Sequence, residues 1–218
     1  MLEQVDWGQV WIATQETCYM VGISTLFTVL LGIPLGVLLF ITDRDQLWEN
    51  IALQRVLGLI VNFLRAVPFI VLVLLLFPVS EFLLNTSLGP TAATVPLIAG
   101  AAPFYARMVE TAIREIDSGV IEAAQAMGAS KLAIIRKVFI PEALPAIVSG
   151  LTVTCVSLIS YSAMAGIVGG GGLGDSAFRF GFQSFNDQML VVCSLLLIIL
   201  VQIVQGIGDW VSKKLDKR

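Results

Sequence analysis

The chain has 218 residues, of which 57% are hydrophobic and only 13% are charged, whereas a soluble globular domain is about half apolar and about a quarter charged. Together with a mean hydropathy of +0.89, this composition excludes an ordinary soluble domain and predicts an all-α polytopic membrane protein. The formal net charge is −3, and no basic cluster precedes the last six residues, so the sequence predicts no nucleic-acid partner.

The absence of histidine limits the chemistry that this chain can perform. Without histidine, Ser/His and Cys/His catalysis and the usual zinc ligands are excluded. The three cysteines, Cys18, Cys155 and Cys193, each lie in an apolar segment and are too far apart for a metal motif, so we interpret them as small packing residues. We expect no catalytic residue and no metal site on this chain.

Five segments are apolar over the length of about 20 residues that a helix needs to cross the hydrocarbon core of a bilayer. They give five predicted transmembrane helices, at residues 17–41, 56–83, 91–113, 143–168 and 188–211. Between the third and fourth of these lies a more polar segment, residues 117–141. We treat residues 1–218 as a single transmembrane domain.

The distribution of Lys and Arg predicts the orientation, because cytoplasmic loops are enriched in these residues. Neither occurs before the first span or in the loop around residues 84–90, whereas Arg179 alone lies in the fourth loop. Five spans with this alternation place the N-terminus outside and the C-terminus inside, with the segment 117–141 in the cytoplasm. The cytoplasmic basic residues are Arg44, Arg55, Arg107, Arg114, Lys131, Arg136, Lys137, Lys213, Lys214, Lys217 and Arg218.

Glycines, prolines and one arginine interrupt the apolar spans. Gly32 and Gly36 give the first span a GxxxG spacing, and Pro68 interrupts the second. Such residues allow close packing or kinks, and an alternative is that they bend a helix lining a transport path. Arg65 lies inside the second span, where a charge is costly. We expect it to reach the cytoplasmic side or to form an ion pair, with Glu110 or Glu122 as candidate partners; a role in transport is the alternative.

The segment 117–141 predicts a helical hairpin at the membrane surface. Residues 120–129 are rich in alanine, and such a small-residue face lets another surface approach closely. Gly128 can end the first helix and Ser130 can cap the second. We expect Pro141 and Pro145 to stop the second helix and start the fourth span. An amphipathic hairpin without a partner is the simpler alternative.

The hairpin resembles the EAA loop of ABC importer permeases, which reads E-A-A-x3-G-x9-I-x-L-P. Glu122, Ala123, Ala124, Gly128 and Pro141 stand at the matching positions. The sequence departs conservatively at two further positions, with Val for Ile at 138 and Ile for Leu at 140. In that family the loop forms coupling helices that dock into a cleft of a cytoplasmic ATPase subunit, so the resemblance implies the same role for these five residues.

Three further stretches, RAVPF at 65–69, GAAPFYARMVETAIREI at 100–116 and SAMAGIVGGGGLGD at 162–175, are similar to the methionine-type permeases of this family. The resemblance implies a homodimer that works with a dimer of ATPase subunits and an extracytoplasmic substrate-binding protein in a bacterial inner membrane. It implies no cofactor on this chain, because ATP and Mg²⁺ bind to the partner ATPase. The implied substrate is an amino acid, with methionine, in its L or D form, favoured.

Candidate residues of the path lie in and after the fourth span. Gly169, Gly171 and Gly174 match G-x-G-x-x-G formally, but neither the strand context of a dinucleotide site nor the Lys-Ser/Thr of a phosphate loop accompanies them. We expect Gly171 to belong to a tight external turn packed at the dimer axis. We also expect Met164 of two protomers to seal the path, with Tyr161 and Ser162 beside it; a structural methionine is the alternative.

Two other classes of protein compete with the importer. An ion-coupled secondary transporter of a small polar solute would carry intramembrane carboxylates and internal repeats, yet only Glu81 and Glu110 lie near span ends. An intramembrane enzyme could use the serines at 157, 160 and 162, but no histidine can activate them, and interhelical hydrogen bonding explains such serines as well.

Overall fold

The computed structural model describes residues 5–216, and every regular element in this part of the chain is a helix, which confirms the prediction of an all-α protein. The helices follow one another in the order α1 (Trp7–Ile41), α2 (Ile51–Ala66), α3 (Phe69–Leu84), α4 (Pro90–Arg114), α5 (Ser118–Ala126), α6 (Lys131–Ile134), α7 (Ile140–Ala165), α8 (Gly172–Ser176) and α9 (Asp187–Leu215), and three π-helical segments lie among them, η1 (Ile135–Phe139), η2 (Gly166–Gly170) and η3 (Ala177–Phe182).

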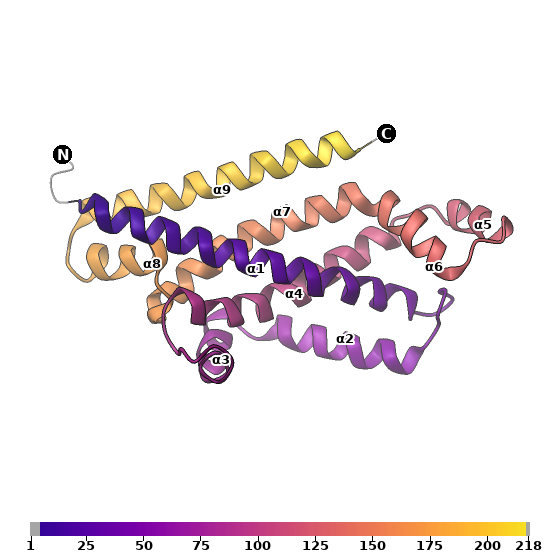
Figure 1. Ribbon diagram of the computed structural model, residues 1–218, viewed down its shortest axis with the longest axis horizontal. Coiled ribbons are helices and arrows are strands. Elements are labelled where there is room, and N and C mark those ends of the chain that lie inside the picture. Colours follow the sequence, from indigo (N-terminus) through magenta and orange to yellow (C-terminus); the bar gives the residue numbers. More distant parts are fainter. Residues whose placement is uncertain (1–4, 217–218) are drawn as a thin grey trace.

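Long helices make up the body of the molecule. In Figure 1, α1, α4, α7 and α9 run along its longest axis, with α5 and α6 at the end near the C-terminus and α8 at the opposite end. Among the described residues, four continuous helices are long and apolar enough to cross a membrane: α1, α4, the helix spanning Lys131–Gly170, and α9. They cover the first, third, fourth and fifth predicted spans.

The second predicted span is a broken helix. The axes of α2 and α3 differ by 107°. In Figure 1, α2 lies along the long axis of the molecule, whereas α3 is seen nearly end-on. The break occurs at Val67, whose backbone is extended (φ −72°, ψ 124°) because the following Pro68 disfavours the helical conformation of its neighbour. Each 16-residue helix rises only about 24 Å, short of the roughly 30 Å hydrocarbon core. The pair together supplies a fifth candidate span.

The first helix begins earlier than the predicted residue 17. Asp6 caps α1, its carboxylate accepting hydrogen bonds from the amides of Gly8 (3.0 Å) and Gln9 (3.1 Å). The apolar pattern is weak at the start of α1, so the boundary predicted from hydropathy lies ten residues after the observed start at Trp7. A carboxylate cap satisfies amides that would otherwise lack acceptors, so the helix extends beyond its most apolar segment.

Glycines bring α1 and α4 together, as the GxxxG spacing predicts. A methyl group added at Gly32 would lie 2.7 Å from the ring of Tyr105, and one added at Gly36 would overlap the backbone of Ala106 and the side chain of Val109. Any larger residue at either position would push the two helices apart. The first and third predicted spans therefore pack along much of their length, and this pair forms the frame against which the other elements lie.

The second helix of the hairpin does not stop at Pro141, contrary to our prediction. The helix continues past Pro141 from Lys131 to Ala165, and the backbone becomes non-helical only at Val168 and Gly169. Pro141 lies in the first turn of α7, directly after η1. Proline lacks a donor and crowds the carbonyl of the residue four positions earlier. The wider π-helical turn absorbs this conflict, as such turns do at helix distortions. The hairpin is consequently continuous with the fourth predicted span.

Candidate functional site

The hairpin consists of two short helices joined by a left-handed turn. Asp117 caps α5 by accepting from the amide of Gly119 (2.7 Å), and Ser130 caps α6 by accepting from the amide of Ala133 (3.3 Å). Between the helices, Gly128 has a φ of +76°, a conformation in which a side chain is strained. The predicted turn at Gly128 and the predicted cap at Ser130 are both present.

One face of the hairpin is open to its surroundings. Glu122, Ala123 and Gly128 are exposed, and Met127 at the tip has 82% of its surface exposed. Ala124 is instead buried and packs inward. The exposed face includes the small residues Ala123 and Gly128 and the carboxylate of Glu122. These properties suit close contact with another protein surface.

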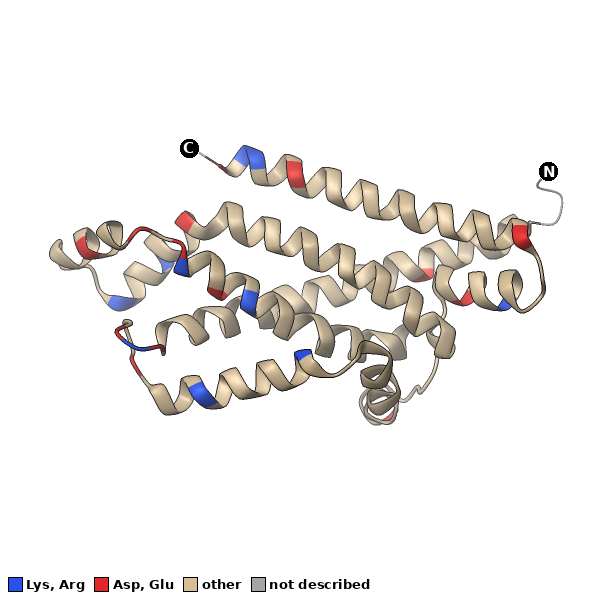
Figure 2. Cartoon of the chain, turned by 180° about the vertical axis from the view of Figure 1, so that it is seen from behind, with Lys and Arg blue, Asp and Glu red and all other residues tan. Residues whose placement is uncertain are grey.

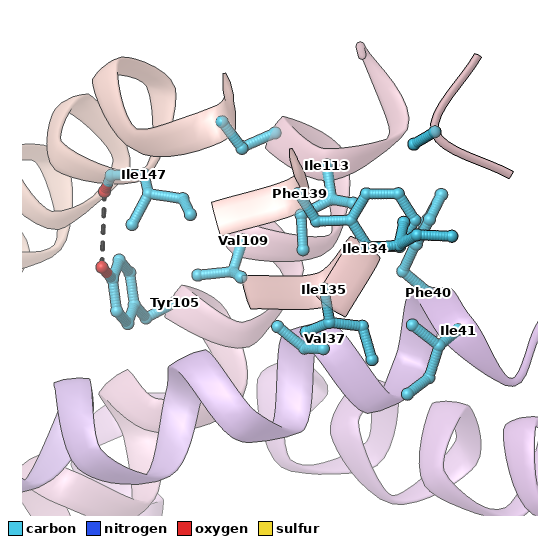
Figure 3. Close-up of a cluster of buried hydrophobic side chains, with 13 residues drawn as sticks. Val37, Phe40, Ile41, Tyr105, Val109, Ile113, Ile134, Ile135, Phe139 and Ile147 are labelled. Carbon is cyan, nitrogen blue, oxygen red and sulfur yellow. Dashed lines mark hydrogen bonds between the residues drawn. The ribbon is translucent and has the colours of Figure 1, made fainter. Parts of the chain in front are cut away.

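A hydrophobic cluster fixes the hairpin to the long helices (Figure 3). Ile134, Ile135 and Phe139 point from α6 and η1 toward α1 and α4. The ring of Phe139, which is fully buried, meets the ring of Phe40 edge-to-face at 5.4 Å between centroids. On the other side of the cluster, the Tyr105 hydroxyl donates to the carbonyl of Ile147 at 3.3 Å. The hairpin is therefore one packed body with the ends of α1, α4 and α7.

A charged network lies beside this cluster. Glu110 is 5% exposed and accepts from Arg107 (2.6 Å) and Arg114 (2.9 Å). Arg107 also donates to Asn62 of α2 (3.1 Å), and Arg114 to Asp43, which follows α1 (2.7 Å). The hydrogen bond from Arg114 holds the pKa of Asp43 below its ordinary value. The network ties α1, α2 and α4 together and occupies both oxygens of Glu110.

Arg65 pairs with neither Glu110 nor Glu122, so both proposed ion pairs are wrong. The buried Glu110 is already held by the two arginines of its own helix, and Glu122 is exposed on the hairpin. Within residues 5–216 Arg65 forms no ion pair, and its guanidinium lies 5.9 Å from the ring centroid of Phe104. Arg65 lines a cavity together with Phe104 and Tyr161.

The structure separates the four candidate path residues. Tyr161 stacks on Phe69 with ring centroids 4.3 Å apart. Ser162 is buried and donates to the carbonyl of Ile159 at 2.7 Å, so it points into the protein. Met164 is 37% exposed and lines an apolar groove formed with η3 and α9. Sealing of the path by Met164 at a dimer axis stays a prediction.

The glycine-rich segment forms a tight turn against α1. Gly171 and Gly172 have φ values of +76° and +80°, and the Gly172 amide donates to a carboxylate oxygen of Glu16 (2.7 Å). The next amide, of Leu173, donates to the Thr17 hydroxyl (2.9 Å). The tight turn that we expected is present and contacts its own chain; its location at a dimer axis stays a prediction. Glu16 and Thr17 were missed because hydropathy does not reveal side chains that receive a distant loop.

Metal-binding groups are not gathered anywhere in the described part of the chain. Across residues 5–216, no three side chains of Cys, Asp or Glu lie close enough together to hold a metal ion. The features that remain for function are therefore the hairpin, the broken second span with its cavity, and the glycine-rich turn.

Comparison with known proteins places these features in a family. Residues 28–217 match the family model described as "binding-protein-dependent transport system inner membrane component". The "probable D-methionine transport system permease protein MetI" of Vibrio cholerae is 52% identical over 94% of this chain and 92% of its own length. The "methionine import system permease protein MetP" of Bacillus subtilis is 49% identical over 98% of this chain and 96% of its own length.

A solved structure agrees with the sequence relatives. One chain of the MetNI methionine ABC transporter in an inward-facing conformation superimposes with a TM-score of 0.94 at 41% identity, covering 98% of this chain and 100% of that chain. The match extends over the hairpin, the broken helix and the glycine-rich turn. This chain therefore belongs to the family of binding-protein-dependent transport system inner membrane components.

Proposed function

We propose that this chain is the permease subunit of an ATP-driven methionine importer in the bacterial inner membrane. It would act as a homodimer, with a cytoplasmic dimer of ATPase subunits and an extracytoplasmic substrate-binding protein. The observation that carries the proposal is the hairpin, whose exposed face bears Glu122 and Ala123 and whose opposite face is packed against α1 and α4. The names of the relatives support methionine as the substrate.

The hairpin has one face exposed to a partner and the other packed against the long helices. Glu122, Ala123 and Gly128 are available to a partner, while Ala124 and Phe139 connect the hairpin to the helices behind it. Pro141 lies where the hairpin becomes α7, so a displacement of α5 and α6 moves α7 as well. Because packed cores shift as units rather than deform continuously, closure of the ATPase dimer would tilt the long helices and open the path outward.

The energy for transport comes from the partner in this proposal. Each tenfold accumulation of substrate costs about 1.4 kcal/mol, and none of the residues described above forms a site for ATP hydrolysis. ATP and Mg²⁺ would bind to the ATPase subunits, and hydrolysis would return the helices to the inward-facing arrangement. This chain contributes the path and the coupling surface, not a reaction.

The charge distribution supports an orientation with the hairpin in the cytoplasm. Figure 2 shows Lys and Arg concentrated at the end of the molecule that carries the hairpin and the C-terminus. The opposite end, near the N-terminus and α8, carries few basic residues, whereas acidic residues lie at both ends. Since basic residues favour the cytoplasmic side, the N-terminus would lie outside, and five crossings, with α2 and α3 as one of them, would bring the C-terminus inside.

Capture of an ATPase subunit tests the proposal. Gly128→Trp puts a bulky side chain on the exposed face of the hairpin, where the structure has open space. Gly89→Trp is a matched control, because Gly89 also has a positive φ (+88°) and open space but lies at the start of α4. Each variant is purified from native membranes in mild detergent, and ATP hydrolysis of the copurifying material is measured.

We expect an ATP-hydrolysing subunit to copurify with the unmodified chain and with Gly89→Trp, but not with Gly128→Trp. If both variants fail to copurify the subunit, misfolding rather than the hairpin face explains the result. A monodisperse elution profile of each variant checks that neither variant is misfolded. If the unmodified chain captures no such subunit, the ATP-driven proposal fails. Methionine uptake driven by an ion gradient without ATP would then favour the secondary transporter.

A further inference from the structure

The cavity at the break between α2 and α3 has the chemistry of a site for an amino acid. Its volume is about 270 Å³, close to the lower end of small-ligand pockets at about 300 Å³. Four helices supply its wall, with Arg65 on α2, Phe69 on α3, Phe104 on α4 and Tyr161 on α7. One cation and three aromatic rings therefore face a space of the size of a small zwitterion.

Arg65 is the charge in this wall, and the described part of the chain gives it no carboxylate. A guanidinium stays protonated and is costly in a membrane span unless something compensates it. The contact with the face of Phe104 at 5.9 Å is a cation–π interaction, which leaves the donors at the edge of the guanidinium free for an anion. Arg65 is therefore an exposed residue beside the Phe104 ring, and its hydrogen-bonding capacity is not used by residues 5–216.

The start of α3 adds to the attraction for an anion. Pro68 gives α3 no side-chain cap, so the first amides of this helix have no side-chain acceptor, and Phe69, its first residue, lines the cavity. A helix start carries partial positive charge. Broken membrane helices in transporters direct such ends at anionic groups of their substrates. Here the partial positive charge at the start of α3 adds to the charge of Arg65 and does not form a site by itself.

The aromatic part of the wall suits an apolar side chain. Phe69 and Tyr161 stack with their planes only 10° apart and their centroids 4.3 Å apart, which makes a flat and rigid surface. Aromatic rings attract thioether sulfur as well as aliphatic groups. Met164, three residues after Tyr161 on α7, lines a different groove with η3 and α9, so the cavity and the proposed gate are separate features.

We propose that this cavity binds the transported amino acid, with Arg65 holding its carboxylate and the stacked Phe69–Tyr161 pair contacting its side chain. The inference rests on the proposed function and names the substrate site within it. Because the wall comes from four helices, a tilt of the helices would separate Arg65 from the rings. The affinity of the site would therefore differ between the outward- and inward-facing arrangements, and uptake requires release in the inward-facing one.

The test measures methionine uptake and ATP hydrolysis in parallel, with the complete transporter in phosphatidylcholine vesicles. Arg65→Gln removes the charge, and Arg65→Lys retains it without the planar guanidinium. Arg55→Gln is the matched control, because Arg55 is exposed on the same helix but lies outside the cavity. We expect Arg65→Gln to lower the maximal uptake rate by roughly ten- to one-hundred-fold, the size of a lost charge-assisted hydrogen bond, and Arg65→Lys to recover part of it.

Capture of the ATPase subunit separates this inference from the proposed function. We expect both Arg65→Gln and Arg55→Gln to capture the ATPase subunit, and the control Arg55→Gln to hydrolyse ATP at the rate of the unmodified transporter. Uptake by Arg65→Gln equal to that of Arg55→Gln would overturn the site and leave the importer intact. Failure of the unmodified chain to capture the ATPase would instead refute the proposed function.

An anionic lipid headgroup is the other source of an anion for Arg65, and the lipid composition distinguishes it. If Arg65 binds a lipid phosphate, adding phosphatidylglycerol should stimulate the unmodified transporter but not Arg65→Gln, and the two should transport equally in pure phosphatidylcholine. That result would overturn the proposal. A deficit of Arg65→Gln in pure phosphatidylcholine, unaffected by phosphatidylglycerol, supports it.

Discussion

Truncation of Phe139 should detach the hairpin from the long helices. The Phe139 side chain is fully buried among residues of α1, α4 and η1, and its ring packs edge-to-face on Phe40. Replacement of a core phenylalanine by alanine costs about 3–5 kcal/mol, including an aromatic pair of about 0.5–1.5 kcal/mol. We expect Phe139→Ala to lose about 4 kcal/mol, because the surrounding β-branched side chains collapse poorly into the space. Phe139→Leu should lose less than Phe139→Ala, because leucine fills more of the space than alanine does.

The assay combines unfolding with local proteolysis of the purified permease in one detergent. Leu132→Ala is the control, since Leu132 lies on the same hairpin with half of its surface exposed. Phe139→Ala should lower the unfolding midpoint and speed tryptic cleavage at the hairpin residues Lys131 and Arg136. In the assembled transporter it should leave ATP hydrolysis active while reducing uptake. A midpoint and cleavage rate equal to those of Leu132→Ala would refute the view that this cluster fixes the hairpin.

Three other substitutions test separate parts of the structure. Gly174→Ala should prevent extraction of a monodisperse permease, because the added methyl would overlap the backbone of α7, whereas Gly22→Ala, which meets no atom within 4 Å, should extract normally. Glu110→Gln should cost about 1.5–3 kcal/mol of unfolding free energy, since it weakens two charge-assisted hydrogen bonds; the more exposed Asp43→Asn should cost less than about 1 kcal/mol, and equal losses in thermal unfolding would contradict this ranking. Met164→Ala should raise the basal leak of methionine from loaded vesicles, and an unchanged leak would remove Met164 as the gate.

Local patterns in the sequence predicted the helices and the hairpin. Apolar length located α4, the α7 segment and α9 to within a few residues, because a bilayer requires long apolar helices whatever their packing. The turn at Gly128 and the cap at Ser130 followed from local backbone chemistry. The resemblance of residues 122–141 to the EAA loop, and not their periodicity, indicated the family that the comparisons establish.

Other features depended on contacts between distant residues, which hydropathy does not encode. A proline signals an interruption but not its size: Pro68 breaks the second span by 107°, whereas a π-helical turn carries the helix past Pro141. The partners assigned to Arg65 were wrong because Glu110 is already bound by two arginines on its own helix.

The sequence by itself thus determined that this chain forms membrane helices, where most of them lie, and that a helical hairpin resembling the EAA loop lies between the third and fourth spans. Only the tertiary structure decided what those helices bring together. It joined the hairpin to α1 and α4 through Phe40 and Phe139, and it placed Arg65 in a cavity with rings from three other helices. The physical reason is that apolar length and turn chemistry act between neighbours in the chain, whereas packing and charge pairing act between residues that only folding makes neighbours.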